Sequence, residues 1–179
     1  MDEQTKHWST VVGIDPDNVE SGVAMVRTSP DKTEHTVEVQ KMPFPRLCDW
    51  LRMMRAGKNY YDSSVVVVLE GGWLNASNWH ALGKYMSAAK AAAIGRSVGM
   101  NHQTGILIEQ MCVYLGITCK VVKPLRKIWK GMDGKITQEE ITRVLRMDKL
   151  PRMNQDTRDA LLLAWTYRNE KKPNKNAKG

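Results

Sequence analysis

Two apolar segments of this chain each end in a carboxylate, and this arrangement constrains the fold more than any other feature. Residues 11–14 lead into Asp15, and the valine-rich residues 65–69 lead into Glu70. A continuous apolar run like the second is typical of a strand that helices cover on both faces of a parallel sheet. A carboxylate at the end of such a strand is unstable unless a cation neutralises it. The two segments therefore predict a covered sheet with a cation site at one edge.

The rest of the pattern predicts an α/β fold with a five-stranded mixed sheet. Alternating or continuous apolar residues indicate strands near residues 9–15, 22–28, 36–41, 65–69 and 117–122. Short turns separate the first three strands, which favours an antiparallel meander. Long helical segments separate the others, which favours parallel pairing with helices on both faces of the sheet.

Helical spacing and capping signals indicate the remaining elements. Gly57 is expected to end the first helix, and Gly99 or Gly105 is expected to divide the second stretch into two. Thr137 and Glu140 have the spacing of a capping box. The expected helical segments are residues 47–56, 76–115, 137–146 and 155–168.

Size and composition predict one domain over residues 1–170 and a basic flexible tail over residues 171–179. We find no apolar run of the roughly 20 residues that span a bilayer and no apolar signal segment, so we expect a cytoplasmic location or its organellar or viral equivalent, with no membrane partner. The three cysteines include no C-x-x-C pair, which disfavours a disulfide framework or a zinc site.

The chain is basic, with a formal net charge of +8, and four lysines after Glu170 supply half of it. The body is therefore basic as well, which favours nucleic acid as a partner. A cluster of cations follows the predicted last strand and is suited to holding phosphates. Its members are Lys120, Lys123, Arg126, Lys127, Lys130 and Lys135.

A second acidic pair, Asp156 and Asp159, is three residues apart and so lies on one face of the last helix. Asp15 and Glu70 are expected at the same edge of the sheet if their strands are parallel neighbours. Four carboxylates of this kind suit Mg²⁺ or Mn²⁺. Two such ions about 4 Å apart activate water and stabilise the leaving oxygen in phosphodiester hydrolysis.

Each acid also has a purely structural interpretation. Asp15 in Asp-Pro-Asp begins a turn, Glu70 before two glycines is a solvated strand end, and Asp156 is a helix cap. The order and placement of the four together favour the metal site.

The chain resembles the RuvC-type Holliday junction resolvases of the ribonuclease H-like superfamily over residues 11–167. The resemblance rests on Gly-Ile-Asp-Pro at 13–16, Leu-Glu at 69–70, Lys-Leu-Pro at 149–151 and Gln-Asp-Thr-Arg-Asp-Ala-Leu at 155–161. It implies a ribonuclease H-like fold and catalytic, metal-binding roles for Asp15, Glu70, Asp156 and Asp159, with two Mg²⁺ or Mn²⁺ ions at each active site.

The resemblance also implies a DNA recombination and repair enzyme. Such an enzyme acts as a homodimer, binds a four-way junction and makes paired symmetric nicks that leave 5′-phosphates. A branch-migration motor as a further partner stays open.

Three further positions carry over from the family. Trp73, three residues after the second acid, is expected either to stack on a base or to pack within its loop. Lys123 and Lys135 resemble active-site lysines that contact the scissile phosphate and stabilise developing charge, or else they are solvated surface lysines.

Two departures from the family pattern stand out. Asp17 replaces a usual glycine and is either a turn residue or an influence on metal affinity. The segment at residues 75–95 is longer than in the bacterial enzymes. Lys84 within it is expected to contact DNA, or else the segment forms an extra helix or a dimer contact.

A structure-selective DNA endonuclease is therefore the leading hypothesis. The alternatives are a broader branched-DNA or flap nuclease of the same fold, a non-catalytic junction-binding module, and a phosphotransferase. The last is disfavoured because we find no second domain copy or second glycine-rich phosphate loop.

Overall fold

A computed structural model describes residues 7–57, 64–75 and 86–172, and the structural statements below concern these residues. Five strands form one sheet in the order β3-β2-β1-β4-β5. The first three pair antiparallel, whereas β4 is parallel to both β1 and β5. The predicted five-stranded mixed sheet, with its first three strands antiparallel, is therefore confirmed. The strands are β1 (Thr10–Asp15), β2 (Ser21–Thr28), β3 (His35–Met42), β4 (Val65–Glu70) and β5 (Cys119–Val122).

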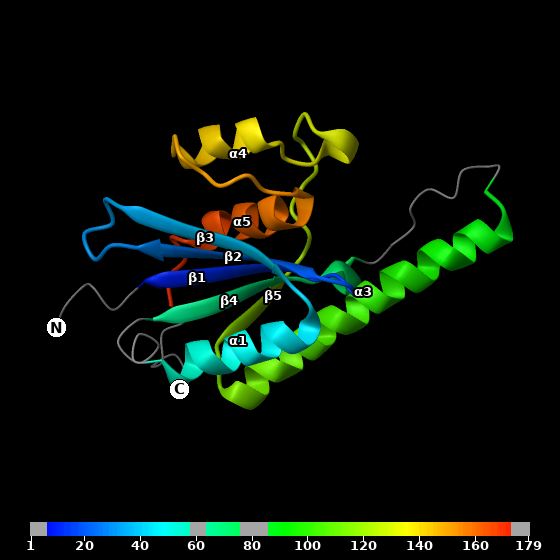
Figure 1. Cartoon of the computed structure of the whole chain (residues 1–179), viewed down its shortest axis with the longest axis horizontal. Coiled ribbons are helices and arrows are strands. Elements are labelled where there is room, and N and C mark those ends of the chain that lie inside the picture. Colours follow the sequence, from blue (N-terminus) through cyan, green and yellow to red (C-terminus); the bar gives the residue numbers. More distant parts are fainter. Residues whose placement is uncertain (1–6, 58–63, 76–85, 173–179) are drawn as a thin grey trace, which may run out of the picture.

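Helices cover both faces of the sheet (Figure 1). On one face lie α1 and α3, and on the other lies α5, with α4 packed outside it. No described helix is long and apolar enough to cross a membrane. The helices are α1 (Phe44–Ala56), α3 (Ala88–Leu115), α4 (Gln138–Leu145) and α5 (Gln155–Tyr167), with short 3₁₀ turns η2 (Gly72–Leu74) and η3 (Met132–Gly134).

The strand alternation divides the core into two clusters, one on each face. Val66 and Val68 of β4 belong to the cluster under α5, whereas Val67 and Leu69 belong to the cluster under α1 and α3. Residues 65–69 are each at most 6% exposed. The prediction of a strand buried on both faces is therefore confirmed.

The expected division of the second helical stretch is wrong for the described residues. Helix α3 runs unbroken for 28 residues and ends at Gly116, which has a left-handed φ of 64°. A glycine inside a helix costs only about 1 kcal/mol, so neither Gly99 nor Gly105 breaks it. Figure 1 shows the first half of α3 extending past the end of the sheet. Residues 76–85 lie outside the described part.

The predicted capping box at the start of α4 is confirmed. The Thr137 hydroxyl accepts from the Glu140 backbone N–H at 3.2 Å, and the Glu140 carboxylate accepts from the Thr137 backbone N–H at 3.0 Å. At the other end of the chain, Lys171 forms a β-bridge with His7. The first residues of the predicted tail therefore contact the body, and residues 173–179 lie outside the described part. All three cysteines are free thiols.

Two glycines let α5 lie unusually close to the sheet. A Cβ atom at Gly13 would lie 2.1 Å from the backbone oxygen of Ala160 and 2.8 Å from the backbone nitrogen of Ala164. A Cβ atom at Gly22 would lie 2.2 Å from the backbone oxygen of Asp156. Since real Cβ atoms do not approach backbone this closely, only glycine permits this contact between α5 and strands β1 and β2.

We expect Gly13→Ala to lower the free energy of unfolding by about 3 kcal/mol, the upper end of the usual range for overpacking, because the obstruction is backbone. Gly99→Ala is the matched control, since nothing lies within 4 Å of its added methyl group. That substitution removes a helical glycine and should stabilise the protein by roughly 0.5–1 kcal/mol. Urea denaturation measures both, and equal effects of the two substitutions would contradict the proposed packing.

Candidate active site

Asp15 and Glu70 end neighbouring parallel strands. The register of β1 and β4 pairs Ile14 with Leu69, so the next residue of each strand lies beside its counterpart. Because side chains alternate along a strand, both acids point to the same face as Gly13 and Val68, which is the face that α5 covers. The expectation that the two acids meet at one edge is confirmed.

Helix α5 begins above this edge. Its N-terminal cap is Asn154, whose side chain accepts from the Thr157 backbone N–H at 3.0 Å. The interpretation of Asp156 as the helix cap is therefore wrong. The close approach at Gly13 and Gly22 brings the first turns of α5, with Asp156 and Asp159, over the ends of β1 and β2.

A pocket of about 120 Å³ collects three of the four acids. Asp15, Glu70 and Asp159 belong to the lining, from β1, β4 and α5 respectively. The loop between β5 and α4 supplies most of the other lining residues. Its contributions include the cations Arg126, Lys127 and Lys135 and the ring of Trp129.

Asp159 is held by a cation and an amide. The Lys135 ammonium lies 3.2 Å from its Oδ2, and the Gln155 Nε2 donates to its Oδ1 at 2.7 Å. Burial opposes the charged form of Lys135, but attraction to Asp159 and more weakly to Asp15 and Asp156 outweighs burial and raises the lysine pKa. Lys135 therefore stays charged and partly neutralises the acidic pocket.

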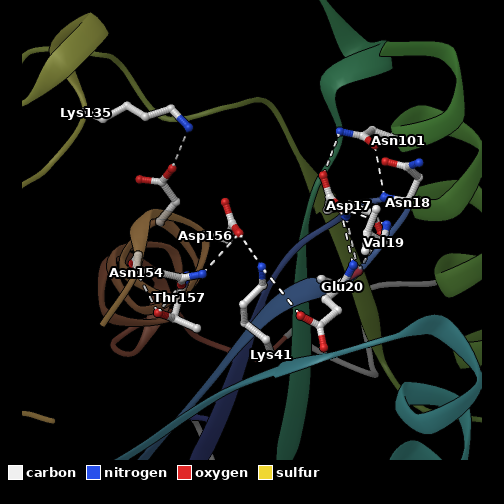
Figure 2. Close-up of polar contacts among 12 residues, drawn as sticks. Asp17, Asn18, Val19, Glu20, Lys41, Asn101, Lys135, Asn154, Asp156 and Thr157 are labelled. Carbon is white, nitrogen blue, oxygen red and sulfur yellow. Dashed lines mark hydrogen bonds and ion pairs between the residues drawn. The ribbon is translucent and has the colours of Figure 1, made fainter. Parts of the chain in front are cut away.

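Asp156 is held separately, by Lys41 of β3. The Lys41 ammonium lies 3.1 Å from Asp156 Oδ2 and 3.8 Å from Glu20 Oε2, as Figure 2 shows. The hydrogen bond to Asp156 is the main cause of the raised pKa of Lys41. The sequence analysis missed this lysine. The only signal for it is the sheet register, which pairs Lys41 with Gly22 directly below Asp156.

The two strand acids are electrostatically strained. Burial raises the pKa of Asp15 well above its usual value, and repulsion from Glu70 and Asp159 adds to the effect. Burial and repulsion from Asp159 raise the pKa of Glu70 to about 7, against attraction to Lys135 and Lys127. Buried carboxylates that repel each other in this way would gain from a further cation.

The acid cluster suits a divalent metal in its donor chemistry, because its ligands are hard carboxylate oxygens. In the arrangement described here, however, no group of three or more His, Cys, Asp or Glu side chains surrounds a common point at metal-binding distance. Two of the acids hold lysines instead. The metal-ligand roles of the four acids stay a prediction.

The other predicted DNA contacts fall in different places. Arg126 and Lys127 line the pocket, whereas Lys123 and Lys130 are exposed and do not line it. Lys84 lies outside the described residues. Of the two predicted active-site lysines, the structure thus brings Lys135, and not Lys123, to the acids.

Trp73 packs against α3. A Cβ atom at Gly105 would lie 2.4 Å from the Trp73 ring, and the His102 ring is edge-on to it at 6.1 Å between centroids. Trp73 is half-buried and belongs to the edge of the core cluster under α3. This geometry is that of a packing residue of the loop.

Asp17 has the contacts of a turn residue. Its Oδ1 accepts from the backbone N–H of Val19 at 2.8 Å and of Glu20 at 3.3 Å. Its Oδ2 accepts from the Asn101 side chain at 3.3 Å, and Asn101 Oδ1 in turn accepts from the Asn18 backbone N–H at 3.0 Å. Figure 2 shows this group beside the Lys41 contacts. Asp17 thus ties the β1–β2 turn to α3.

No protein-family profile and no curated protein matches the chain. Among solved structures, it is similar to Thermus thermophilus RuvC in complex with Holliday junction substrate, with 16% identity, a TM-score of 0.49, and coverage of 88% of this chain and 90% of that one. A second Thermus thermophilus RuvC structure has 16% identity, a TM-score of 0.44 and coverage of 90% and 99%.

Fowlpox virus resolvase in complex with substrate Holliday junction DNA has 13% identity, a TM-score of 0.37 and coverage of 88% and 95%. At these identities and TM-scores the similarity concerns the fold and carries no conclusion about function.

We expect the stability of the metal-free protein to fall as pH rises from about 4.5 to about 7, because folded Glu70 keeps a proton that the unfolded chain has released. Glu70→Gln removes this penalty. At pH 8 in EDTA it should raise the free energy of unfolding by at least about 1.4 kcal/mol, the equivalent of one pKa unit. Glu34→Gln makes the same chemical change at an exposed site and is the control. If the free energy of unfolding of Glu70→Gln depended on pH in the same way as that of the wild type, the described environment of Glu70 would be contradicted.

Proposed function

We propose that this protein is a metal-dependent, structure-selective DNA endonuclease that resolves four-way junctions by paired symmetric nicks leaving 5′-phosphates. The observation that carries the proposal is the pocket that Asp15, Glu70 and Asp159 line together with the cations of the loop between β5 and α4. The family resemblance of the sequence motifs around these acids supports it. The basic body of the chain supports a nucleic-acid substrate.

Asp15, Glu70 and Asp159 are the residues that would hold Mg²⁺ or Mn²⁺, with Asp156 beside them. Such ions, when bound, supply Lewis-acid activation of water and stabilise charge on the reacting phosphate. They would also replace Lys135 and Lys41 as partners of the helix acids. The raised pKa values of Asp15 and Glu70 support this assignment, since a bound cation relieves the repulsion that raises them.

The cations of the pocket wall bind and orient the DNA in this proposal. Arg126 and Lys127 line the same pocket as the acids and are exposed, so they are placed to hold phosphates next to the scissile one. Lys135 also lines the pocket and pairs with Asp159, so its ammonium is placed to stabilise negative charge that develops on the phosphate.

A homodimer belongs to the same proposal. Each chain contributes one acid pocket. Paired nicks in the two opposing DNA strands of a junction therefore require two chains, one for each nick. A two-fold dimer presents two such pockets with the required symmetry.

We expect Asp15→Asn and Asp159→Asn each to lower the cleavage rate of a synthetic four-way junction by at least about 100-fold, the loss typical of removing one charge-stabilising contact at a reaction centre. Junction affinity should stay within about twofold, because the phosphate-binding cations remain. Asp49→Asn is the control, as Asp49 is an exposed acid that pairs with Arg52 on α1.

Wild-type turnover by either pocket variant would refute the proposed role of the acids. Strong junction binding with no cleavage in Mg²⁺ or Mn²⁺ would instead identify a non-catalytic binding module. Equal rates on four-way junctions, three-way junctions and flaps would identify the broader nuclease.

Metal binding has a readout that does not depend on activity. We expect Mn²⁺ at about 100 times its dissociation constant to stabilise the wild type by about 2.7 kcal/mol, seen as a rise in the thermal midpoint. Asp159→Asn should lose most of this rise and Asp49→Asn none of it. An equal rise in all three proteins would exclude the pocket as the metal site.

A further inference from the structure

Two large apolar side chains stand in solvent on the loop that walls the acid pocket. Ile128 is 74% exposed and Met132 is 86% exposed. Lys127 and Trp129, on either side of Ile128, line the pocket, as does Gly134, two residues after Met132, whereas Ile128 and Met132 do not. In Figure 1 this loop is the yellow-green segment before α4, at the end of the sheet where α5 begins. Both side chains are therefore exposed on the loop that lines the candidate active site.

The loop around this pair is fixed. The Trp129 backbone N–H donates to the Gly134 carbonyl at 3.0 Å, and the Gly131 N–H donates to the Lys135 carbonyl at 3.0 Å. The Lys130 N–H donates to the Glu140 carboxylate at 3.0 Å, which is itself anchored by the capping box of α4.

Close packing also fixes the path of the loop. Gly134 has a left-handed φ of 71°, and a Cβ atom there would lie 2.7 Å from the Lys127 carbonyl oxygen. The Trp129 ring packs against the core cluster under α5. These contacts fix the backbone of the loop on both sides of Ile128 and Met132.

The charges around the pair favour DNA as its partner. Arg126, Lys127 and Lys130 are exposed on the same loop, and Asp133 is its single acid. Alternating cations and apolar side chains match a surface that offers phosphates beside unstacked bases. Trp73, the aromatic expected to contact bases, packs against α3 instead. Ile128 and Met132 are large exposed apolar side chains on the loop that lines the pocket.

We propose that Ile128 and Met132 form an apolar wedge that inserts between bases at the branch point of the DNA, next to the scissile phosphate. The wedge holds the junction open while Arg126 and Lys127 bind the flanking phosphates. This inference rests on the proposed function, since it takes branched DNA as the substrate of the acid pocket.

The test uses a four-way junction with 2-aminopurine at the branch point, bound in EDTA so that cleavage does not intervene. The full-length wild type should raise the 2-aminopurine fluorescence, because unstacking relieves its quenching. The double variant Ile128→Gln/Met132→Gln should lose this rise. Its junction affinity should fall about 10-fold, within the range for loss of contacts to one unstacked base, whereas linear duplex affinity should stay within about twofold.

Met53→Gln is the matched control, since Met53 is 66% exposed on α1, on the other face of the sheet. It should behave as the wild type. Both substituted loop positions are exposed, and equal thermal midpoints of the variant and wild type would exclude a folding defect.

A normal fluorescence rise with the double variant, while the wild type cleaves junctions, would overturn the wedge and leave the proposed function intact. A change from dimer to monomer on sedimentation of the double variant would also overturn it, because the pair would then be a contact between copies of the chain. A wild type that neither binds nor cleaves junctions would overturn the proposed function and the wedge together.

Discussion

The contact between α5 and the sheet is the interaction on which the candidate site depends. Gly13 and Gly22 remove the side chains that would hold the helix away, and the backbone of α5 lies directly on β1 and β2. Without this approach Asp159 would not share a pocket with Asp15 and Glu70. The geometry of the acids is therefore set by two residues that carry no chemistry of their own. The same close packing that holds α5 on the sheet thus also determines where the charged groups of the site lie.

The charge balance of the site follows from that packing. The packing buries Asp15 and Glu70 close enough to repel each other and Asp159. Two lysines offset part of this negative charge, since Lys135 pairs with Asp159 and Lys41 pairs with Asp156. The lysines compensate only part of the charge, since the pKa values of both strand acids remain raised. A further cation at this site would relieve the repulsion that remains.

The sequence predicted the mixed sheet and the meeting of Asp15 and Glu70 at one end of it, because both follow from local patterns. Apolar runs predict the strands, and the alternation along a strand predicts the sheet face to which each side chain points. The spacing of Asp156 and Asp159 predicts that both lie on one face of the last helix. Lys41 was missed because its partner lies more than a hundred residues away and only the register brings them together. The division of α3 was wrong because burial of the second half of the helix against the core outweighs the weak propensity effect of its glycines.

Helix α3 has a mechanical consequence through Asn101. This side chain bonds both Asp17 and the backbone of Asn18, in the turn that directly follows Asp15. The half of α3 before Asn101 extends past the sheet, and the half after it is anchored in the core (Figure 1). Asn101 therefore joins the middle of α3 to the turn that begins directly after Asp15. A displacement of α3 would be transmitted to that turn through these two hydrogen bonds.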